Sequence, residues 1–233
     1  MKIFFTYCLA SLLLIGTALT TPLPDGYIVP KETVSPSHRY GFMVPIFSIL
    51  SDANDVHNAL VDLKTGRVVA EIDAPPGFDH RLNHVKILPP WWSKDESLVL
   101  WTVAGKWCPT ALVLIHFRNG VQVWQLNLLT TFQKEILIST KAVAPEKYEE
   151  AKQENAGSGT NHPEGFTIDV KPMIKSVASN KRPPLQLPLK IHVTLTSNPK
   201  QLDCIPDLDA TMTGVVKKDG SIEVKQFSVC SKK

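Results

Sequence analysis

The chain has 233 residues, of which 43% are hydrophobic and 20% are charged, and its formal net charge is +3 at pH 7. A chain of this length can bury a sizeable core, as one large domain or two small ones. Lys and Arg residues are scattered among Asp and Glu residues, so no basic patch marks a nucleic-acid partner. The sequence contains no P-loop, dinucleotide fingerprint, G-x-S-x-G elbow or paired C-x-x-C motif, and we predict no cofactor.

The first twenty residues have the order of features of a cleavable signal peptide. Lys2 precedes an uncharged apolar stretch over 3–19, and Ala18 suits either the −1 or the −3 position of a cleavage site. The alternative is a membrane anchor, but this stretch is at the low end of the roughly 17–25 residues that a spanning helix needs. Because no later segment is long and apolar enough to span, we expect an exported mature chain, periplasmic or secreted.

Export leaves three cysteines, Cys108, Cys204 and Cys230, in a compartment that permits disulfides. Cys204 and Cys230 flank a predicted hairpin that turns at Asp219-Gly220. In a tight hairpin the residue opposite Cys230 falls near Asp209, so a Cys204–Cys230 bridge requires the intervening chain to fold back. The alternative is three buried, unpaired thiols.

A repeat is the strongest internal pattern. Each unit has a turn, an apolar strand, a loop, a second strand, a tight turn and a third strand. The first unit begins at Ser35 and makes its tight turn at Lys64–Gly66; the second begins at Trp92 and makes its tight turn at Arg118–Gly120. Gly and Asn supply the positive φ that such hairpins require.

The turns S-P-x-x-R-Y and W-S-x-D-x-S, followed in the first unit by D-L-K-T-G-R-V, resemble the blade unit of WD40-like and related bacterial β-propellers. The resemblance covers about residues 35–128 and contains two units, whereas closed propellers have typically about 4–8 blades. It therefore implies an incomplete propeller or a β-sandwich. As a whole the chain resembles uncharacterised exported bacterial proteins with this arrangement, which implies no activity.

Two helices are predicted after the repeats. Apolar residues at helical spacing predict a helix over 129–142, and Pro145 can open a second helix over 145–155. The second helix is highly charged, so we expect a solvent-exposed flap over the sheet.

A β unit follows the helices. FTIDV predicts a strand, and the segment 189–196 alternates apolar and polar residues in the manner of a strand with one buried face. Asp219-Gly220 predicts the closing hairpin. The expected organisation is a signal peptide (1–20), a blade-like β region (21–128), a helical insert and loop (129–160) and a C-terminal β-hairpin unit (161–233), a mainly β (α+β) fold.

His80 and His84, with Asp79 beside them, are the only histidine pair at short spacing. Prolines on both sides predict a loop, and Arg81 stands where a zinc protease needs Glu, so we predict no metal. Asp79, His80 and His84 remain the candidate catalytic residues.

All five tryptophans fall between residues 91 and 124. Trp101 and Trp124 lie within apolar runs, which predicts core positions. Trp91, Trp92 and Trp107 flank turns and are the candidate residues for binding a ligand or partner.

The sequence favours an exported, non-catalytic protein that binds an envelope protein or an extracellular ligand. This interpretation rests on blade-like units and on absent catalytic motifs, and a fold does not by itself imply a function. One alternative is an exported hydrolase with a loop-built site around His80 and His84. Another is an accessory subunit that completes a β assembly with a partner; the oligomeric state is left open.

Overall fold

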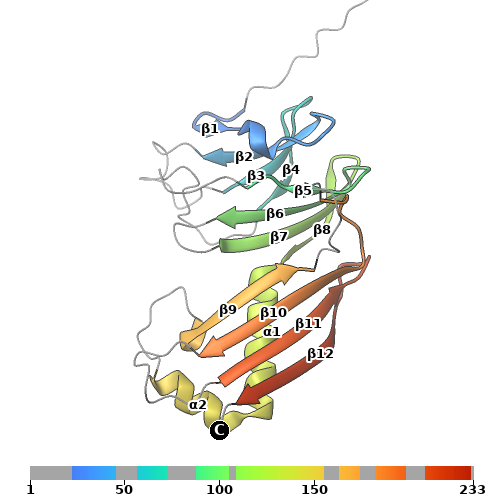
Figure 1. The fold of residues 1–233 in the computed structure, drawn as a ribbon. Helices are drawn as coiled ribbons and strands as arrows, with labels where there is room; N and C mark the ends of the chain where they lie inside the picture. Colours follow the sequence, from blue (N-terminus) through green and yellow to red (C-terminus); the bar gives the residue numbers. More distant parts are fainter. Residues whose placement is uncertain are drawn as a thin grey trace, which may run out of the picture.

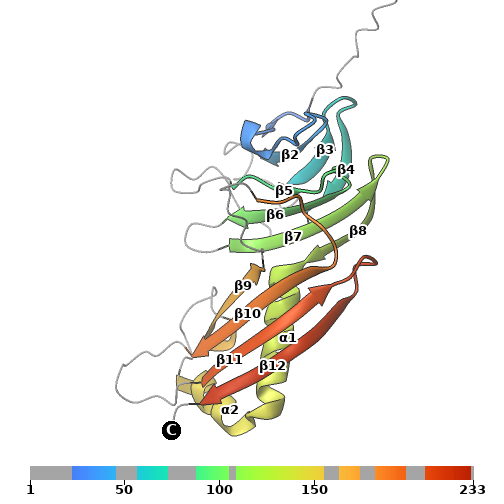
Figure 2. The same ribbon diagram turned by 45° about the vertical axis from the view of Figure 1, so that its right-hand side comes forward.

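The computed structural model describes residues 23–45, 57–72, 88–104, 109–154, 163–173, 182–197 and 208–231. Within these ranges the protein has twelve strands in three antiparallel sheets and two α-helices, which confirms the mainly β (α+β) class. The described strands form no closed barrel. The three sheets follow one another along the length of the molecule, and α1 lies along one face of the third (Figures 1 and 2).

The first sheet runs in chain order, β1 to β4, with a 3-10 turn between its first two strands. Its elements are β1 (Tyr27–Ile28), η1 (Lys31–Thr33), β2 (Tyr40–Pro45), β3 (Ala59–Asp62) and β4 (Arg67–Glu71). Every residue of β2 and β3 is buried. Both faces of this sheet are therefore covered at its centre, the outer face by side chains of residues 23–29 and Leu63.

The second sheet repeats this order from β5 to β8. Its strands are β5 (Trp91–Trp92), β6 (Leu98–Ala104), β7 (Pro109–Arg118) and β8 (Val121–Asn127). The tight turns of the two units use glycine with positive φ at equivalent positions, Gly66 (69°) and Gly120 (71°). Residues with a Cβ rarely adopt this backbone conformation.

The turn that opens each unit has the same hydrogen bonds in both. In the first, Ser35 N–H donates to the Tyr40 carbonyl (2.8 Å), Tyr40 N–H donates to Ser35 Oγ (3.2 Å) and His38 has a φ of 60°. The second turn has the corresponding bonds, from Ser93 to Leu98 (2.9 Å) and from Leu98 to Ser93 Oγ (3.0 Å), with a φ of 56° at Glu96. The sequence repeat is thus a repeat of backbone geometry.

The first two sheets pack face to face through an aromatic and aliphatic core. Phe42 stacks on Trp101 with ring centroids 4.2 Å apart, and Tyr40 meets Phe117 edge-on at 4.9 Å. Such pairs add about 0.5–1.5 kcal/mol beyond the area they bury. Trp101 is 1% exposed, in agreement with its predicted core position.

The rest of the described chain forms a helix-covered sheet. Its elements are α1 (Leu128–Val143), α2 (Pro145–Glu154), η3 (Pro163–Gly165), β9 (Phe166–Pro172), β10 (Leu189–Ser197), β11 (Leu208–Val216) and β12 (Ile222–Ser231), with sheet order β12-β11-β10-β9. Strand β10 alternates buried and exposed residues, as predicted. The apolar face of the sheet packs on α1.

Local signals fix the helix ends near their predicted positions. The side chain of Asn127 accepts a hydrogen bond from Thr130 N–H (3.3 Å), which caps the first turn of α1. Pro145 opens α2, where its missing N–H is not needed.

The second helix differs from the expected flap. Tyr148 is 1% exposed and Ala151 is fully buried, and both belong to the main core. Burial raises the pKa of the Tyr148 hydroxyl, which also hydrogen-bonds to Glu164. Charged residues on the outer side of α2 masked this apolar pair in the sequence.

Two glycines let neighbouring elements approach closely. A Cβ on Gly214 would lie 2.2 Å from Cε1 of Phe132 in α1, and a Cβ on Gly220 would lie 3.0 Å from the ring of Trp124 in β8. Gly214 also follows a register shift in the β11–β12 ladder. The third sheet is therefore fitted to both α1 and the second sheet.

The closing hairpin has the predicted register, with Cys230 directly opposite Asp209. Cys230 is exposed on β12. Cys204 and Cys108 lie outside the described residues, so the bridge remains a prediction. The signal peptide, residues 1–20, also lies outside them. No helix in the described ranges is long and apolar enough to cross a membrane.

Candidate functional site: a cleft between the second and third sheets

A cleft of about 420 Å³ lies where the second sheet, α1 and strand β9 meet. Pockets of roughly 300–1,000 Å³ at the junction of two structural units are the usual binding sites for small molecules and short segments. Its apolar wall is built from all three elements: Trp91, Leu100, Leu112, Leu129, Ile168 and Val170.

Strand alternation places Trp91 in this wall. Neighbouring residues of a strand point to opposite faces, so the two tryptophans of β5 separate. Trp92 is 8% exposed and packs between the first two sheets, 6.1 Å from the ring centroid of Phe42. Trp91 faces the other way, is half-buried and donates its indole N–H to the carbonyl of Pro183 (2.6 Å). Trp91 is thus a fixed part of the cleft, whereas Trp92, expected at the surface, belongs to the core.

Among the described residues, the charged side chains that line the cleft come from β9 and from the segment that begins at Arg182. Asp169, Lys171 and Arg182 are exposed lining residues. Lys171 forms an ion pair with Asp169, whereas no described residue forms an ion pair with Arg182. The cleft therefore combines an apolar wall with one available guanidinium, which carries five N–H donors in a fork suited to carboxylates.

Three of the residues that line the cleft each come directly after a segment outside the described ranges. Leu88 follows residues 73–87, Pro109 follows residues 105–108 and Arg182 follows residues 174–181, and all three line it. The candidates Asp79, His80, His84 and Trp107 belong to these segments and lie outside the described residues, so they remain predictions.

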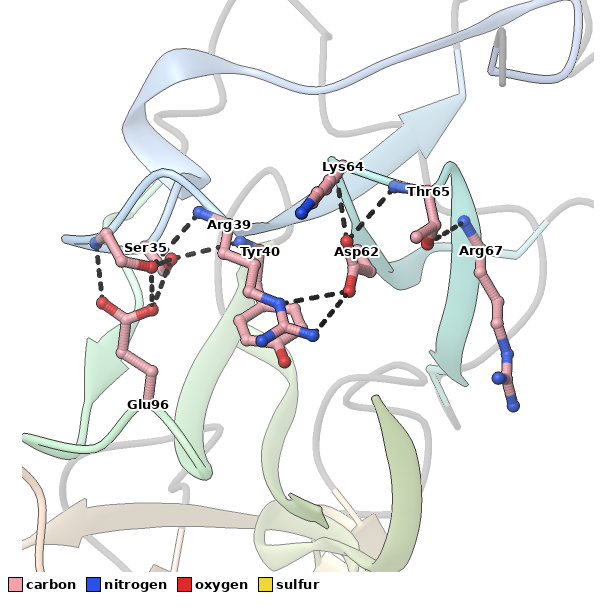
Figure 3. A network of polar contacts seen from close by, with 9 residues as sticks. Ser35, Arg39, Tyr40, Asp62, Lys64, Thr65, Arg67 and Glu96 are labelled. Carbon is pink, nitrogen blue, oxygen red and sulfur yellow. Dashed lines mark hydrogen bonds and ion pairs between the residues drawn. The ribbon is translucent and has the colours of Figure 1, made fainter. Parts of the chain in front are cut away.

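A second polar feature joins the opening turns of the two repeats (Figure 3). Glu96 accepts hydrogen bonds from Ser35 Oγ (2.8 Å), Ser37 N–H (2.7 Å) and Ser37 Oγ (2.5 Å). Glu96 occupies the positive-φ position of the second turn, which aims its side chain at the first turn. We call the contact of Glu96 with Ser35 and Ser37 the turn clasp.

The other carboxylates around the turn clasp are also engaged. Asp62 is 5% exposed, and its Oδ2 accepts hydrogen bonds from Nε and Nη2 of Arg39, each at 3.2 Å. Asp95 accepts from Ser93 Oγ (2.6 Å) and Ser97 Oγ (2.8 Å), and these hydrogen bonds hold the pKa of Asp95 below its usual range. Because these carboxylates already have partners, the network reads as structural support for the repeat.

Metal chemistry has no assembled site in the described part of the chain. No group of three His, Cys, Asp or Glu side chains lies together in those ranges in a way that could hold a metal ion. The cleft between the sheets is therefore the described feature best suited to a function.

Comparisons with models of protein families, with curated proteins and with solved structures find no match to this chain. The role of the cleft has to follow from its own geometry.

Proposed function

We propose that this protein is an exported, non-catalytic binding protein whose ligand lies in the cleft between the second and third sheets. One observation carries the proposal: an apolar wall with Trp91 at its edge borders a guanidinium, Arg182, that has no ion-pair partner among the described residues. The ligand class that fits is amphipathic, with an apolar body and an acidic group.

The rigidity of the cleft wall supports a role in ligand binding, as opposed to a gap left by imperfect packing between the sheets. Leu100 and Leu112 come from the centre of a hydrogen-bonded sheet and are 5% and 6% exposed. The indole N–H of Trp91 is held by the backbone of the opposite segment. A preformed wall avoids the ordering cost that binding would otherwise have to overcome.

The accessory-subunit alternative has weaker support. The outer face of the first sheet, where a further blade would stack, is covered by Leu23, Tyr27 and Val29. The hydrolase alternative rests on residues 79–84, for which the described part of the chain offers no geometry.

The test is a titration of residues 21–233 with 1-anilinonaphthalene-8-sulfonate (ANS), an apolar fluorophore with an anionic group. We expect saturable, blue-shifted emission. Gln133 lines the cleft from α1 and Lys134 is the exposed next residue. Gln133→Phe should fill part of the cleft and weaken ANS binding by about tenfold or more, which corresponds to about 1.4 kcal/mol. Lys134→Phe is the matched control and should leave the affinity unchanged.

A second pair of probes tests the guanidinium. Arg182→Gln should weaken binding of ANS but leave binding of the uncharged N-phenyl-1-naphthylamine unchanged. Lys190→Gln, at an exposed position of β10, should affect neither. Equal ANS affinity in the parent and the Gln133→Phe variant would overturn the proposal.

A further inference from the structure

We propose that the ligand of this cleft is an extended peptide segment that adds to the third sheet as a new strand, antiparallel to β9. This inference rests on the proposed binding function and specifies the ligand class. The segment has apolar residues at alternate positions, facing the cleft, and an acidic residue between them that reaches Arg182.

The position of β9 makes this addition possible. It is the last strand of the order β12-β11-β10-β9, and no described strand pairs with its outer edge. Five consecutive residues of β9, 168–172, line the cleft. Because successive side chains point to opposite faces of a sheet, a cavity that touches five in a row follows the edge of the strand.

The direction of the free backbone groups follows from the ladder. Met173 N–H donates to the Lys190 carbonyl (2.8 Å), so Met173 faces β10. In an antiparallel strand the N–H and C=O groups of one residue point the same way and alternate along the chain. Ile168 and Val170 therefore direct these groups outward. Pro172 also belongs to the residues whose backbone groups point away from β10. Its lack of an N–H therefore costs the β9–β10 ladder no hydrogen bond.

Side-chain recognition follows from the same register. In an antiparallel pair, a residue that bonds to Ile168 or Val170 lies directly opposite it and shares its face. Ile168 and Val170 pack against the main core. An added strand would therefore place its bonding residues toward Leu112 and Trp91, and its intervening residues beside Asp169 and Lys171.

The charges favour an acidic segment. Lys171 and Asp169 neutralise each other by their ion pair, which leaves Arg182 as the charged lining residue with no ion-pair partner among the described residues. Backbone hydrogen bonds give affinity, and the alternate pockets and the guanidinium give specificity; this is the general pattern when a peptide augments a sheet edge.

The test uses the full mature chain and the probe peptide acetyl-Thr-Val-Glu-Val-Glu-Val-Thr-amide, measured by calorimetry. One peptide carries N-methyl groups on its last two valines, and its matched control carries them on its two glutamates. N-methylation removes the donor and blocks that edge but keeps the side chain. We expect the valine-methylated peptide to bind at least about tenfold more weakly and the glutamate-methylated peptide to bind like the parent. Any other pattern, equal binding of both included, overturns the proposal.

Protein variants separate this inference from the binding function. Val170→Pro and Val170→Ala both change the same wall side chain, but only Val170→Pro removes an outward N–H that β10 does not use. Both variants should fold and bind ANS with similar affinity, and Val170→Pro should bind the probe peptide at least about tenfold more weakly than Val170→Ala. Replacing both glutamates of the probe by lysine should weaken binding to the parent protein but not to Arg182→Gln. If Gln133→Phe abolishes ANS binding while Val170→Pro binds the peptide as tightly as Val170→Ala, the binding function stands and edge addition fails. Dimers that form through β9 and disappear in Val170→Pro would identify a second copy of the chain as the occupant and overturn the peptide proposal.

Discussion

The contact between Gly214 and Phe132 gives the sharpest stability prediction. Phe132 is fully buried in α1, and a Cβ added at Gly214 would lie 2.2 Å from its Cε1 and 2.6 Å from its Cζ. Carbon atoms in optimal contact are about 3.5–4.0 Å apart, so the ring would have to move by more than about 1 Å within a packed core. Gly214→Ala should therefore destabilise the protein by steric overlap.

The expected size follows from two opposing effects. Overpacking a core typically costs about 1–3 kcal/mol, and the contact here is at the severe end. Replacing glycine also restricts the unfolded chain, which returns about 0.4–1 kcal/mol. We expect a net loss of about 2 kcal/mol in the free energy of unfolding.

Urea unfolding, followed by circular dichroism and tryptophan fluorescence, measures this change. Phe132→Leu should make room for the added methyl, so the double variant should be more stable than the sum of the single changes by about 1 kcal/mol or more. Gly41→Ala is the control and should cost less stability than Gly214→Ala. The atom nearest to the added Cβ there is Cγ1 of Val29 at 2.7 Å, which belongs to a half-buried segment that can shift. A loss below about 0.5 kcal/mol for Gly214→Ala, or strict additivity with Phe132→Leu, would refute the reasoning.

Four further predictions follow from other parts of the molecule. Glu96→Ala should cost about 1–2 kcal/mol in urea unfolding because it removes the turn clasp, whereas Glu32→Ala, at an exposed position, should change stability by less than about 0.5 kcal/mol. Because the pKa of Asp95 is lowered, its hydrogen bonds stabilise the fold above the ordinary carboxyl pKa of about 3.9, and this stabilisation is lost as the pH falls through the lowered value. The urea midpoint of Asp95→Asn should therefore lie below that of the parent protein at pH of about 6 and equal it at pH of about 2. A difference between the two midpoints that persists in acid would contradict this prediction. Gly220→Ala should cost about 1–2 kcal/mol, because the residue has a φ of 84° and its Cβ would press on Trp124; an unchanged urea midpoint would show that the hairpin can move away. Intact mass of the exported protein should give an N-terminus at Leu19 or Thr21, and Ala18→Tyr should block this cleavage; an uncleaved parent chain would instead indicate an anchor.

Elements with strong local signals could be predicted from the sequence. The two opening turns were recognisable as polar turns before apolar strands, with the units beginning at Ser35 and Trp92. The structure pairs Ser35 with Ser93, whose hydroxyls make the same bond to the backbone five residues on. The Asp219-Gly220 turn set the register of the last hairpin, and with it the pairing of Cys230 with Asp209. In each case a few neighbouring residues determine the geometry.

Packing between distant segments could not be predicted in the same way. Trp91 and Trp92 both flank a turn. Trp92 is core because the first sheet packs on it, and Trp91 is a cleft wall because the third sheet, about 75 residues further on, lies on the other side. Tyr148 and Ala151 lie in a charged helix whose core contacts come from other elements. The cleft itself is formed by three elements that no local pattern relates.

The position of β9 at the edge of its sheet could be predicted from the sequence only in part. The strand was predicted from FTIDV, but nothing in those residues tells whether β9 pairs with a second strand in addition to β10. Pro172 is the one local hint, because proline within a strand favours an edge position.

The most direct test of the cleft as a binding site is the indole N–H spectrum of the 15N-labelled mature chain during titration with ANS. Trp91→Phe assigns the Trp91 signal, whose N–H is bonded to the Pro183 carbonyl at the cleft. We predict that this signal shifts progressively and saturates with the ANS fluorescence, while the signals of the core residues Trp92 and Trp101 stay in place. A saturating fluorescence change with an unmoved Trp91 signal would place the bound molecule elsewhere and contradict the proposal.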